Sequence, residues 1–157
     1  MEQTQMAAIY DRMKNTIYRT ALAYCRNIQD AEDITHDVFL IRFRREEPFP
    51  DDEAEKAWML RVTVNCCKNL LKSFRRRFTV PLEDASEVCV TQDEHTVWDA
   101  VNALPARYRI VVHLYYFEGY TVGEIGKITD RSETAVQTQL YRARAILKKA
   151  LGEEAEL

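Results

Sequence analysis

Apolar residues recur at helical spacing along most of this chain, and strand-like alternation is hard to find. The first such segment, residues 7–26, has an apolar side made of Ile9, Met13, Ile17, Ala21, Tyr24 and Cys25. The second, residues 30–45, can be N-capped by Asp30, and its apolar side is made of Ala31, Ile34, Val38 and Ile41. We therefore predict two helices that pack into a core.

The third predicted helix starts near Ala54, after the loop at residues 44–55, whose two prolines should end the second helix. Its apolar side consists of Leu60, Val64, Cys67 and Leu71. The other side is a polar stripe about 26 Å long at 1.5 Å per residue, made of Trp58, Arg61, Asn65, Lys68, Lys72 and Arg75.

This polar stripe has one sign of charge. No acidic residue occurs between Lys56 and Leu82, and Arg75–Arg77 closes the stretch with three consecutive cations. Cations suit phosphates, an indole ring suits base stacking, and an amide suits a base edge. The pattern favours a nucleic-acid surface over the alternative, a basic face that is merely solvated.

A second module is predicted near the C-terminus, after an acidic stretch. Residues 81–104 contain six acidic residues and no Lys or Arg, and the weak periodicity of residues 80–102 indicates a flexible connector. Leu104–Pro105 then begins a helix with packing residues Tyr108, Val111, Val112, Leu114 and Tyr115.

The last part of the chain predicts a helix-turn-helix. Thr121 and Glu124 can form a capping box for its first helix, and Ser132 can N-cap the second. The second helix should bury Val136, Leu140, Ala143 and Leu147. Its outward side, suited to a DNA major groove, carries Arg131, Thr134, Gln137, Thr138, Tyr141 and Arg142 beside Ser132. The alternative is an ordinary helical hairpin with a solvated polar face.

Composition narrows the function classes. The 157 residues are 46% hydrophobic and 30% charged, with a formal net charge of -3. No apolar run approaches the ~20 residues of a membrane span, and residues 1–14 do not resemble a signal peptide, so we expect a cytoplasmic protein without membrane insertion. The four cysteines form no CxxC pair and the three histidines are scattered. We therefore expect no metal, no cofactor and no catalytic residues.

The second predicted helix has more apolar surface than one core contact needs, because Phe39, Leu40 and Phe43 lie partly outside its buried stripe. Glu32 and Asp33 lie in its first turn, where the helix dipole alone can explain carboxylates. We hypothesise that this surface contacts a partner protein.

In combination, these segments resemble the small bacterial sigma factors of the extracytoplasmic-function type. The resemblance covers nearly the whole chain, and it depends on the order and spacing of DAEDITHDVF at Asp30–Phe39, AWMLRVTVN at Ala57–Asn65, LPARYRIVVHL at Leu104–Leu114 and EIGKITDRSETAVQTQLYRARAIL at Glu124–Leu147. It implies an all-α protein of two small helical domains: residues 1–80 as sigma region 2, residues 81–103 as a flexible acidic linker, and residues 104–157 as sigma region 4 with the helix-turn-helix.

The resemblance also implies partners and site residues. Core RNA polymerase would be contacted by Asp30, Glu32, Asp33, His36 and Phe39. The minus-ten promoter element would be contacted by Trp58, Arg61, Asn65, Lys68, Lys72, Arg75 and Arg76, with Asn65 at an extruded base, Trp58 near the duplex fork and the loop at residues 49–56 helping to hold that base. The minus-thirty-five element would be read by Arg131, Ser132, Thr134, Gln137, Thr138, Tyr141 and Arg142. An anti-sigma factor is a common partner in this family, although nothing in the sequence identifies one.

Some positions depart from the commoner family pattern. His36 stands where Gln is frequent, Gly126 where Ala is frequent, and Gln137–Gln139 where Lys-Ser-Arg is common. The loop at Asp51–Glu55 is unusually acidic for a segment near DNA.

Two other functions fit parts of the sequence. A stand-alone helix-turn-helix regulator would leave the polar stripe at residues 58–75 unexplained. A metal-dependent nuclease or phosphohydrolase could use Glu32, Asp33 and His36, but these residues lie at a helix start without a second ligand cluster. The expected function is therefore that of a sigma factor, which is not an enzyme and directs core RNA polymerase to promoters.

Overall fold

The computed structural model describes the backbone of residues 2–78 and 97–152 and, except at residues 75–78, their side chains. Every regular element within these ranges is helical, which confirms the predicted all-α fold. The helices belong to two compact units, Met1–Ser73 and Phe74–Leu157. Residues 81–96 of the linker predicted at 81–103 lie outside the described residues, and so do the side chains of Arg75 and Arg76.

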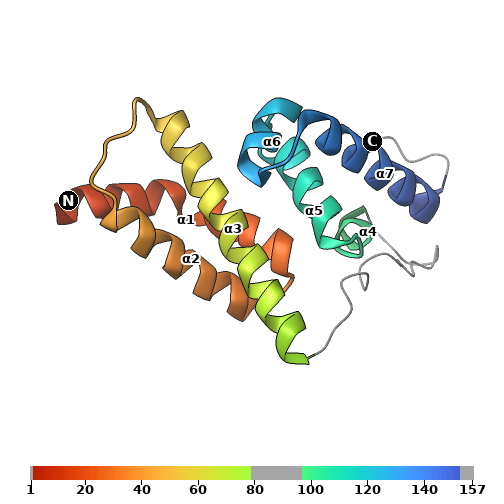
Figure 1. Ribbon diagram of the computed structural model, residues 1–157, viewed down its shortest axis with the longest axis horizontal. Coiled ribbons are helices and arrows are strands. Elements are labelled where there is room, and N and C mark those ends of the chain that lie inside the picture. The colour runs from red at the N-terminus through yellow and green to blue at the C-terminus, as the bar shows by residue number, and fades with distance from the viewer. Residues whose placement is uncertain (1, 79–96, 153–157) are drawn as a thin grey trace. The chain divides into compact units, whose positions relative to one another are not determined.

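Helices α1 (Gln3–Cys25) and α2 (Ile28–Arg44) lie side by side in the first unit (Figure 1). Arg26 ends α1 in the left-handed backbone region, with φ 56°, and its N–H donates to the carbonyl of Leu22 at 2.8 Å. The Asn27 side chain then caps α2 by accepting the N–H of Asp30 at 2.9 Å. Our N-cap prediction for Asp30 is therefore wrong: Asn27 supplies the acceptor three residues earlier, and Asp30 lies in the first turn.

The buried face of α2 differs from the prediction at its C-terminal end. Ala31, Ile34 and Val38 are buried as expected, but Ile41 is 39% exposed. The buried positions of the last turns are Phe39 and Arg42. Residues four apart lie on the same side of a helix, so the buried side continues from Val38 to Arg42. Hydrophobicity alone gave no reason to place an arginine in the core.

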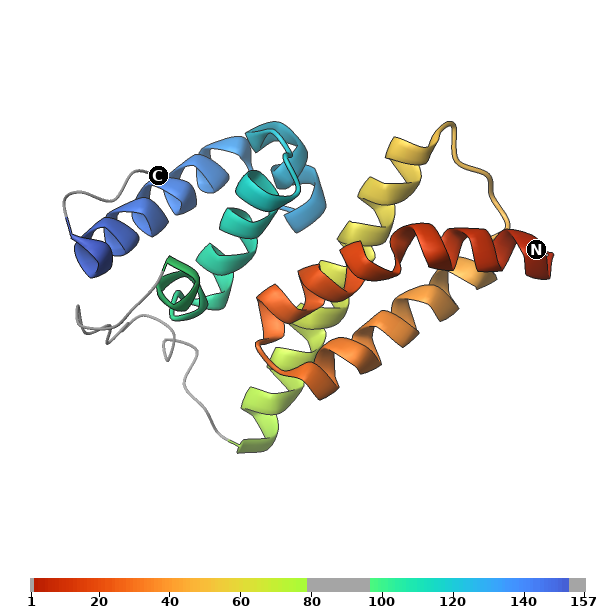
Figure 2. The same ribbon diagram turned by 180° about the vertical axis from the view of Figure 1, so that it is seen from behind.

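Helix α3 (Asp52–Phe78) lies across α1 and α2, as Figure 2 shows from behind. It begins two residues before the predicted start, because the Asp51 carboxylate accepts the N–H of Ala54 at 2.8 Å and so caps the helix. Its core-facing residues include the predicted Leu60, Val64 and Cys67, while Leu71 is only half-buried.

The second unit is built around its last helix. It contains α4 (Val97–Asn102), α5 (Ala106–Val112), a π-helical turn η2 (His113–Phe117), α6 (Val122–Thr129) and α7 (Glu133–Leu151). Helix α7 contacts α4, α5 and α6, and the fully buried side chains include Leu104, Ile110, Leu114, Ile125 and Leu147. Helix α4, which the sequence did not predict, falls in the stretch expected to be a connector, and there Ala100 is buried.

The turn between α6 and α7 is short and tightly packed. Asp130 adopts a left-handed backbone, with φ 58°, and the N–H of Arg131 donates to the carbonyl of Gly126 at 2.8 Å. A Cβ atom built on Gly126 would lie 2.6 Å from the carbonyl oxygen of Arg131. The absence of a side chain at Gly126 therefore permits the close approach of the turn to α6.

None of the helices that the structure describes combines the length and apolarity that crossing a bilayer requires.

Candidate nucleic-acid interface

The polar stripe predicted on α3 is present on the surface of the first unit. Arg61, Asn65 and Lys72 are exposed, whereas Trp58 and Lys68 are half-buried. The opposite side of the same helix is buried in the core, so the orientation of the stripe is set by packing. Cationic and amide groups lined up along one rigid helix can follow a nucleic-acid backbone and reach base edges.

Two aromatic rings meet at the N-terminal end of this stripe. The ring centroids of Phe49 and Trp58 are 5.4 Å apart, with an angle of 53° between the ring planes. The guanidinium of Arg45 lies over both rings, 4.3 Å from the centroid of Phe49 and 5.0 Å from that of Trp58. These contacts hold Trp58 against the α2–α3 loop, so the loop and the stripe form one surface.

A buried ion cluster lies next to the aromatic rings. Glu55, in the first turn of α3, accepts hydrogen bonds from Arg42 on α2, at 2.9 Å from Nε and 2.6 Å from Nη2. Its other carboxylate oxygen accepts from Arg12 on α1. Glu55 and Arg42 are each 6% exposed. The cluster therefore joins all three helices of the unit at the base of the loop.

The cluster also explains much of the acidic loop that seemed unusual for a DNA-binding segment. Asp51 caps α3, Asp52 lies 3.6 Å from the guanidinium of Arg12, and Glu55 is the buried acceptor. Three of its carboxylates thus have structural partners within the protein.

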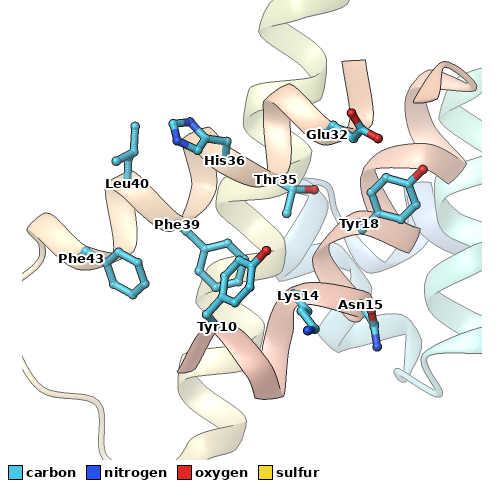
Figure 3. A pocket seen from close by; sticks show the side chains of 10 residues that line it. All are labelled: Tyr10, Lys14, Asn15, Tyr18, Glu32, Thr35, His36, Phe39, Leu40 and Phe43. Atoms are coloured by element: carbon cyan, nitrogen blue, oxygen red, sulfur yellow. The ribbon is translucent and has the colours of Figure 1, made fainter. Parts of the chain in front are cut away.

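A groove runs between α1 and α2 on another part of the same unit (Figure 3). Its volume is about 550 Å³, and its walls are formed by Tyr10, Lys14, Asn15, Tyr18, Glu32, Thr35, His36, Phe39, Leu40 and Phe43. Of the residues predicted to contact the polymerase, Glu32, Asp33 and His36 are exposed and Asp30 is half-buried. These four side chains are accessible to a partner to different degrees.

Phe39 does not provide the spare apolar surface that we predicted. It is only 4% exposed. The centroid of its ring lies 4.9 Å from that of Tyr10 and 5.8 Å from that of Phe43. The exposed large apolar residues of α2 are instead Ile28 at its start, which is 62% exposed, and Leu40 and Ile41, each 39% exposed. Phe39 is a core residue that lines the floor of the groove, because α1 covers the side of α2 from which its ring projects.

The second unit presents the predicted outer face of its helix-turn-helix. Thr134, Gln137, Tyr141 and Arg142 are exposed on α7, Arg131 and Thr138 are half-buried, and Ser132 is exposed at the start of the helix. The Ser132 hydroxyl accepts the N–H of Ala135 at 3.1 Å, which confirms the predicted N-cap. Val136, Leu140, Ala143 and Leu147 are buried as predicted.

Helix α6 is fixed by the predicted capping box. The Thr121 hydroxyl accepts the N–H of Glu124 at 3.2 Å, and the Glu124 carboxylate accepts the N–H of Thr121 at 3.0 Å. The hydrogen bond from the Thr121 N–H, together with one from the Thr121 side chain, lowers the pKa of the Glu124 carboxyl. The reciprocal pair defines where α6 begins.

The cysteines within the described residues are reduced. Cys67 is buried, and Cys25 and Cys66 are half-buried. A hydrogen bond with Cys25, together with burial, raises the pKa of the Cys67 thiol, and burial followed by the charge of Asp37 raises that of Cys66. Raised pKa values reduce the thiolate fraction and the reactivity of these thiols.

Among the described residues, no group of three or more His, Cys, Asp or Glu side chains is placed to hold a metal ion. Glu32, Asp33 and His36, which the hydrolase alternative required, form no such group.

Sequence reasoning missed Arg42 and Arg45 and included Phe49 only as part of a loop. The signal for Arg42 was its position four residues after Val38 on the buried side of α2. No comparable periodic signal exists for Arg45 and Phe49, because a loop has no fixed repeat.

The comparisons with known proteins cover both units. Residues 9–78 match the family model for sigma-70 region 2, and residues 95–147 match that for sigma-70 region 4. The second match begins just before α4, so this helix lies within the region 4 match.

Curated relatives and solved structures agree with these matches. The chain is 28% identical to the ECF RNA polymerase sigma factor SigM of Mycobacterium tuberculosis over 148 residues, which cover 92% of this chain and 76% of the relative. It is 26% identical to the RNA polymerase sigma factor SigV of Bacillus subtilis over 145 residues, which cover 90% and 87% of the two chains.

The fold is similar to that of the sigma factor RpoE of Bartonella quintana, solved in complex with the anti-sigma factor NepR, with a TM-score of 0.76, 18% identity, and coverage of 96% and 99% of the two chains. It is also similar to CnrH, solved with the cytosolic domain of CnrY, with a TM-score of 0.67, 20% identity, and coverage of 98% and 92%. With both conserved regions present in order, the chain belongs to the sigma-70 family and is a sigma factor of the extracytoplasmic-function type, a protein that directs RNA polymerase in transcription initiation.

Proposed function

We propose that this sigma factor opens promoters with the stripe on α3 and selects them with the outer face of α7 while it is bound to core RNA polymerase. The observation that carries the proposal is the stripe itself. Arg61, Asn65 and Lys72 project to solvent from a helix whose other face is buried, and Trp58 lies at its N-terminal end among cations. This combination suits an unpaired DNA strand better than a closed duplex.

Within the minus-ten element, we assign different contacts to different side chains. Asn65 would hydrogen-bond the edge of an extruded base, and Trp58 would stack at the fork between duplex and single strand. The remaining cations, Arg61, Lys68, Lys72, Arg75 and Arg76, would contact phosphates. Unstacking a base costs a few kcal/mol, and aromatic stacking plus phosphate contacts can offset that cost.

Helix α7 would enter the major groove of the minus-thirty-five element. Thr134 and Gln137, near its N-terminal end, would face base edges, and Arg142 would face the backbone. Arg131, Ser132, Thr138 and Tyr141 would complete this contact surface.

For polymerase binding we propose the start and the outer side of α2. Asp30, Glu32, Asp33 and His36 supply polar contacts, and exposed Leu40 replaces Phe39 as the apolar contact. Such a mixture of polar groups and one apolar residue is typical of the rim and centre of a protein interface.

The free chain should bind promoters weakly, because its 25 Asp and Glu residues outnumber its 22 Lys and Arg residues and give a formal net charge of -3. We place the protein in the cytoplasm, where it would act without enzymatic activity of its own. An anti-sigma factor that covers the DNA-binding or polymerase-binding surface would be a suitable regulator, as the relatives solved with NepR and CnrY suggest.

Run-off transcription from a randomised promoter library tests the proposal. Bacterial core RNA polymerase would be assayed with and without the purified chain. Initiation that depends on the chain would support the proposal and give both promoter elements. No stimulation, together with tight sequence-specific duplex binding by the chain alone, would instead favour a stand-alone helix-turn-helix regulator.

Two sets of substitutions separate the proposed surfaces. Lys72→Ala or Arg75→Ala should weaken open-complex formation and leave polymerase binding intact, whereas Asp33→Ala should weaken polymerase binding first. A common defect in the same step would show that the surfaces are wrongly assigned.

A further inference from the structure

The aromatic ring of Phe49 lies close to two guanidinium groups. Arg42 lies 5.0 Å from its centroid and Arg45 lies 4.3 Å from it. Trp58 packs against the same ring at 5.4 Å. The position of Trp58 relative to the DNA stripe therefore depends on where these two cations hold Phe49.

The two arginines differ in how firmly they are held. Arg45 is bound within the loop, where its Nε donates to the carbonyl of Glu47 at 3.2 Å. Arg42 is buried and donates twice to Glu55, which also binds Arg12 of α1. Arg42 thus connects the loop ring to the three-helix core through hydrogen bonds, whereas the Arg45 side chain donates its hydrogen bond within the loop.

Stability alone is a poor explanation for this buried cluster. Within the described part of the chain, Nη1 of Arg42 is buried without a hydrogen-bond partner. Leaving a buried donor unpaired is costly, and a pair of apolar side chains of similar volume often stabilises a fold as well as a buried ion pair does. An apolar pair would leave only Arg45 beside Phe49, and the side-chain hydrogen bond of Arg45 stays within the loop.

We propose that Arg42 is a positioning residue for promoter opening: anchored by Glu55, it holds Phe49 and through it Trp58 in the orientation that receives an unpaired base. This inference rests on the proposed function of the α3 stripe. Arg42 itself does not need to touch DNA, because it is 6% exposed.

The first test uses a double variant, Arg42→Leu with Glu55→Leu, which removes both charges together. Arg12 keeps Asp52 as a partner, at 3.6 Å. The full-length variant should keep the unfolding midpoint of the wild-type chain and its affinity for core polymerase. Its open-complex formation on a duplex promoter should fall about tenfold, the effect expected from a cation–aromatic contact, and should fall less on a promoter with a pre-opened mismatched bubble.

The matched control is Arg44→Leu, which removes the same charge from an exposed position on the same helix. It should change duplex and bubble promoters equally or not at all. Arg42→Lys keeps a charge beside Glu55 but loses the planar guanidinium. This variant should therefore retain only part of the wild-type rate of promoter opening. An Arg42/Glu55 double variant that opens duplex promoters at the wild-type rate would overturn the proposal, and so would equal losses on duplex and bubble promoters.

A second readout does not depend on transcription. The chain has two tryptophans, and Trp98 is 70% exposed, so Trp98→Phe leaves Trp58 as the fluorescent reporter. In this background, the double variant should increase the quenching of Trp58 by acrylamide, whereas Arg44→Leu should not. Unchanged quenching would refute the positioning of Trp58 by Arg42. Failure of the wild-type chain to support initiation would instead refute the proposed function, while the quenching result would still stand.

Discussion

The two surfaces that we assign to DNA are built in different ways. On α3, Trp58 is half-buried and held by Phe49 and Arg45, and the loop beside it is tied to a buried ion cluster. On α7, the corresponding aromatic residue, Tyr141, is 74% exposed. Side chains that are already ordered lose less conformational entropy on binding. A surface that must stabilise an unstacked base benefits from such order, whereas exposed side chains can adapt to base edges and water in a groove.

The largest expected effect comes from a cavity in the core of the unit that carries the first surface. Phe39→Ala should lower the free energy of unfolding by about 3–5 kcal/mol, because it leaves a cavity against Tyr10 and Phe43. Thermal unfolding of the full chain measures this effect. Leu40→Ala, at a 39% exposed neighbouring position, is the control and should cost about 1 kcal/mol or less while weakening polymerase binding. A stable Phe39→Ala chain that only loses polymerase affinity would return Phe39 to the contact surface.

Next in size should be the loss of the ordered ring. Trp58→Ala should reduce open-complex formation about 30-fold, as expected when one base loses its aromatic stacking partner. Permanganate reactivity of unpaired thymines measures the open complex. Tyr141→Ala should have a far smaller effect than Trp58→Ala: it should weaken promoter binding slightly and leave the extent of opening unchanged. If the two substitutions have equal effects on opening, the contrast between the ordered and the adaptable surface fails.

A smaller effect is expected from the base-reading position on α7. Gln137→Ala should reduce the preference for one base pair of the minus-thirty-five element by about 1 kcal/mol, near the lower end for a direct base contact. Competition between promoter variants in run-off transcription measures this preference. Gln137 is exposed, and the substitution leaves its buried neighbour Val136 in place, so the unfolding midpoint should not change. A uniform loss over all promoter sequences would indicate a backbone contact instead.

Two glycines of α6 provide a sharper test of how the helix-turn-helix is packed. Gly126→Ala should lower the stability of the second unit by about 1 kcal/mol, the cost of the clash with the Arg131 carbonyl less the gain in helix propensity. Gly123→Ala is the matched control. Its new Cβ would meet only the Glu133 side chain, at 3.8 Å, so helix propensity should make this variant more stable. A stabilising Gly126→Ala would show that the turn can move away from α6.

The smallest effect should be the pH dependence of the α6 capping box. Hydrogen bonds from Thr121 lower the folded-state pKa of Glu124, so this carboxylate stabilises the fold above its ordinary pKa. The contribution should be lost as the pH falls through the lowered pKa. Unfolding midpoints across the acidic range measure it, with Glu124→Gln as the variant that should lack this pH-dependent component. An identical pH profile for both chains would exclude the carboxylate as its source.

Periodicity predicted the parts of the site that lie on helices. The α3 stripe at Arg61, Asn65 and Lys72 and the outer face of α7 are where the sequence placed them, because core packing fixes the orientation of an amphipathic helix. The capping box of Thr121 and Glu124 was equally predictable, since both partners lie within one turn.

The elements that were not predicted depend on contacts between distant residues. Arg42 can be buried only because Glu55, 13 residues later, neutralises it, and the sequence does not say that the two meet. The same holds for Phe49 and Trp58, which meet only when the loop folds back on α3. Ile41 was assigned to the core because it is apolar, and the charge of Arg42 hid the true continuation of the buried face.

The cluster of Arg12, Arg42 and Glu55 should also restrict how this sequence can change during evolution. A single substitution at Arg42 or Glu55 leaves a buried charge without its partner, which is strongly destabilising, whereas replacing both together is not. The two positions should therefore covary among related sequences, with either an opposite-charge pair or an apolar pair in most of them. Sequences that keep the charged pair should also keep an aromatic residue at the position of Phe49, since the pair presents to it a cation that is anchored in the core.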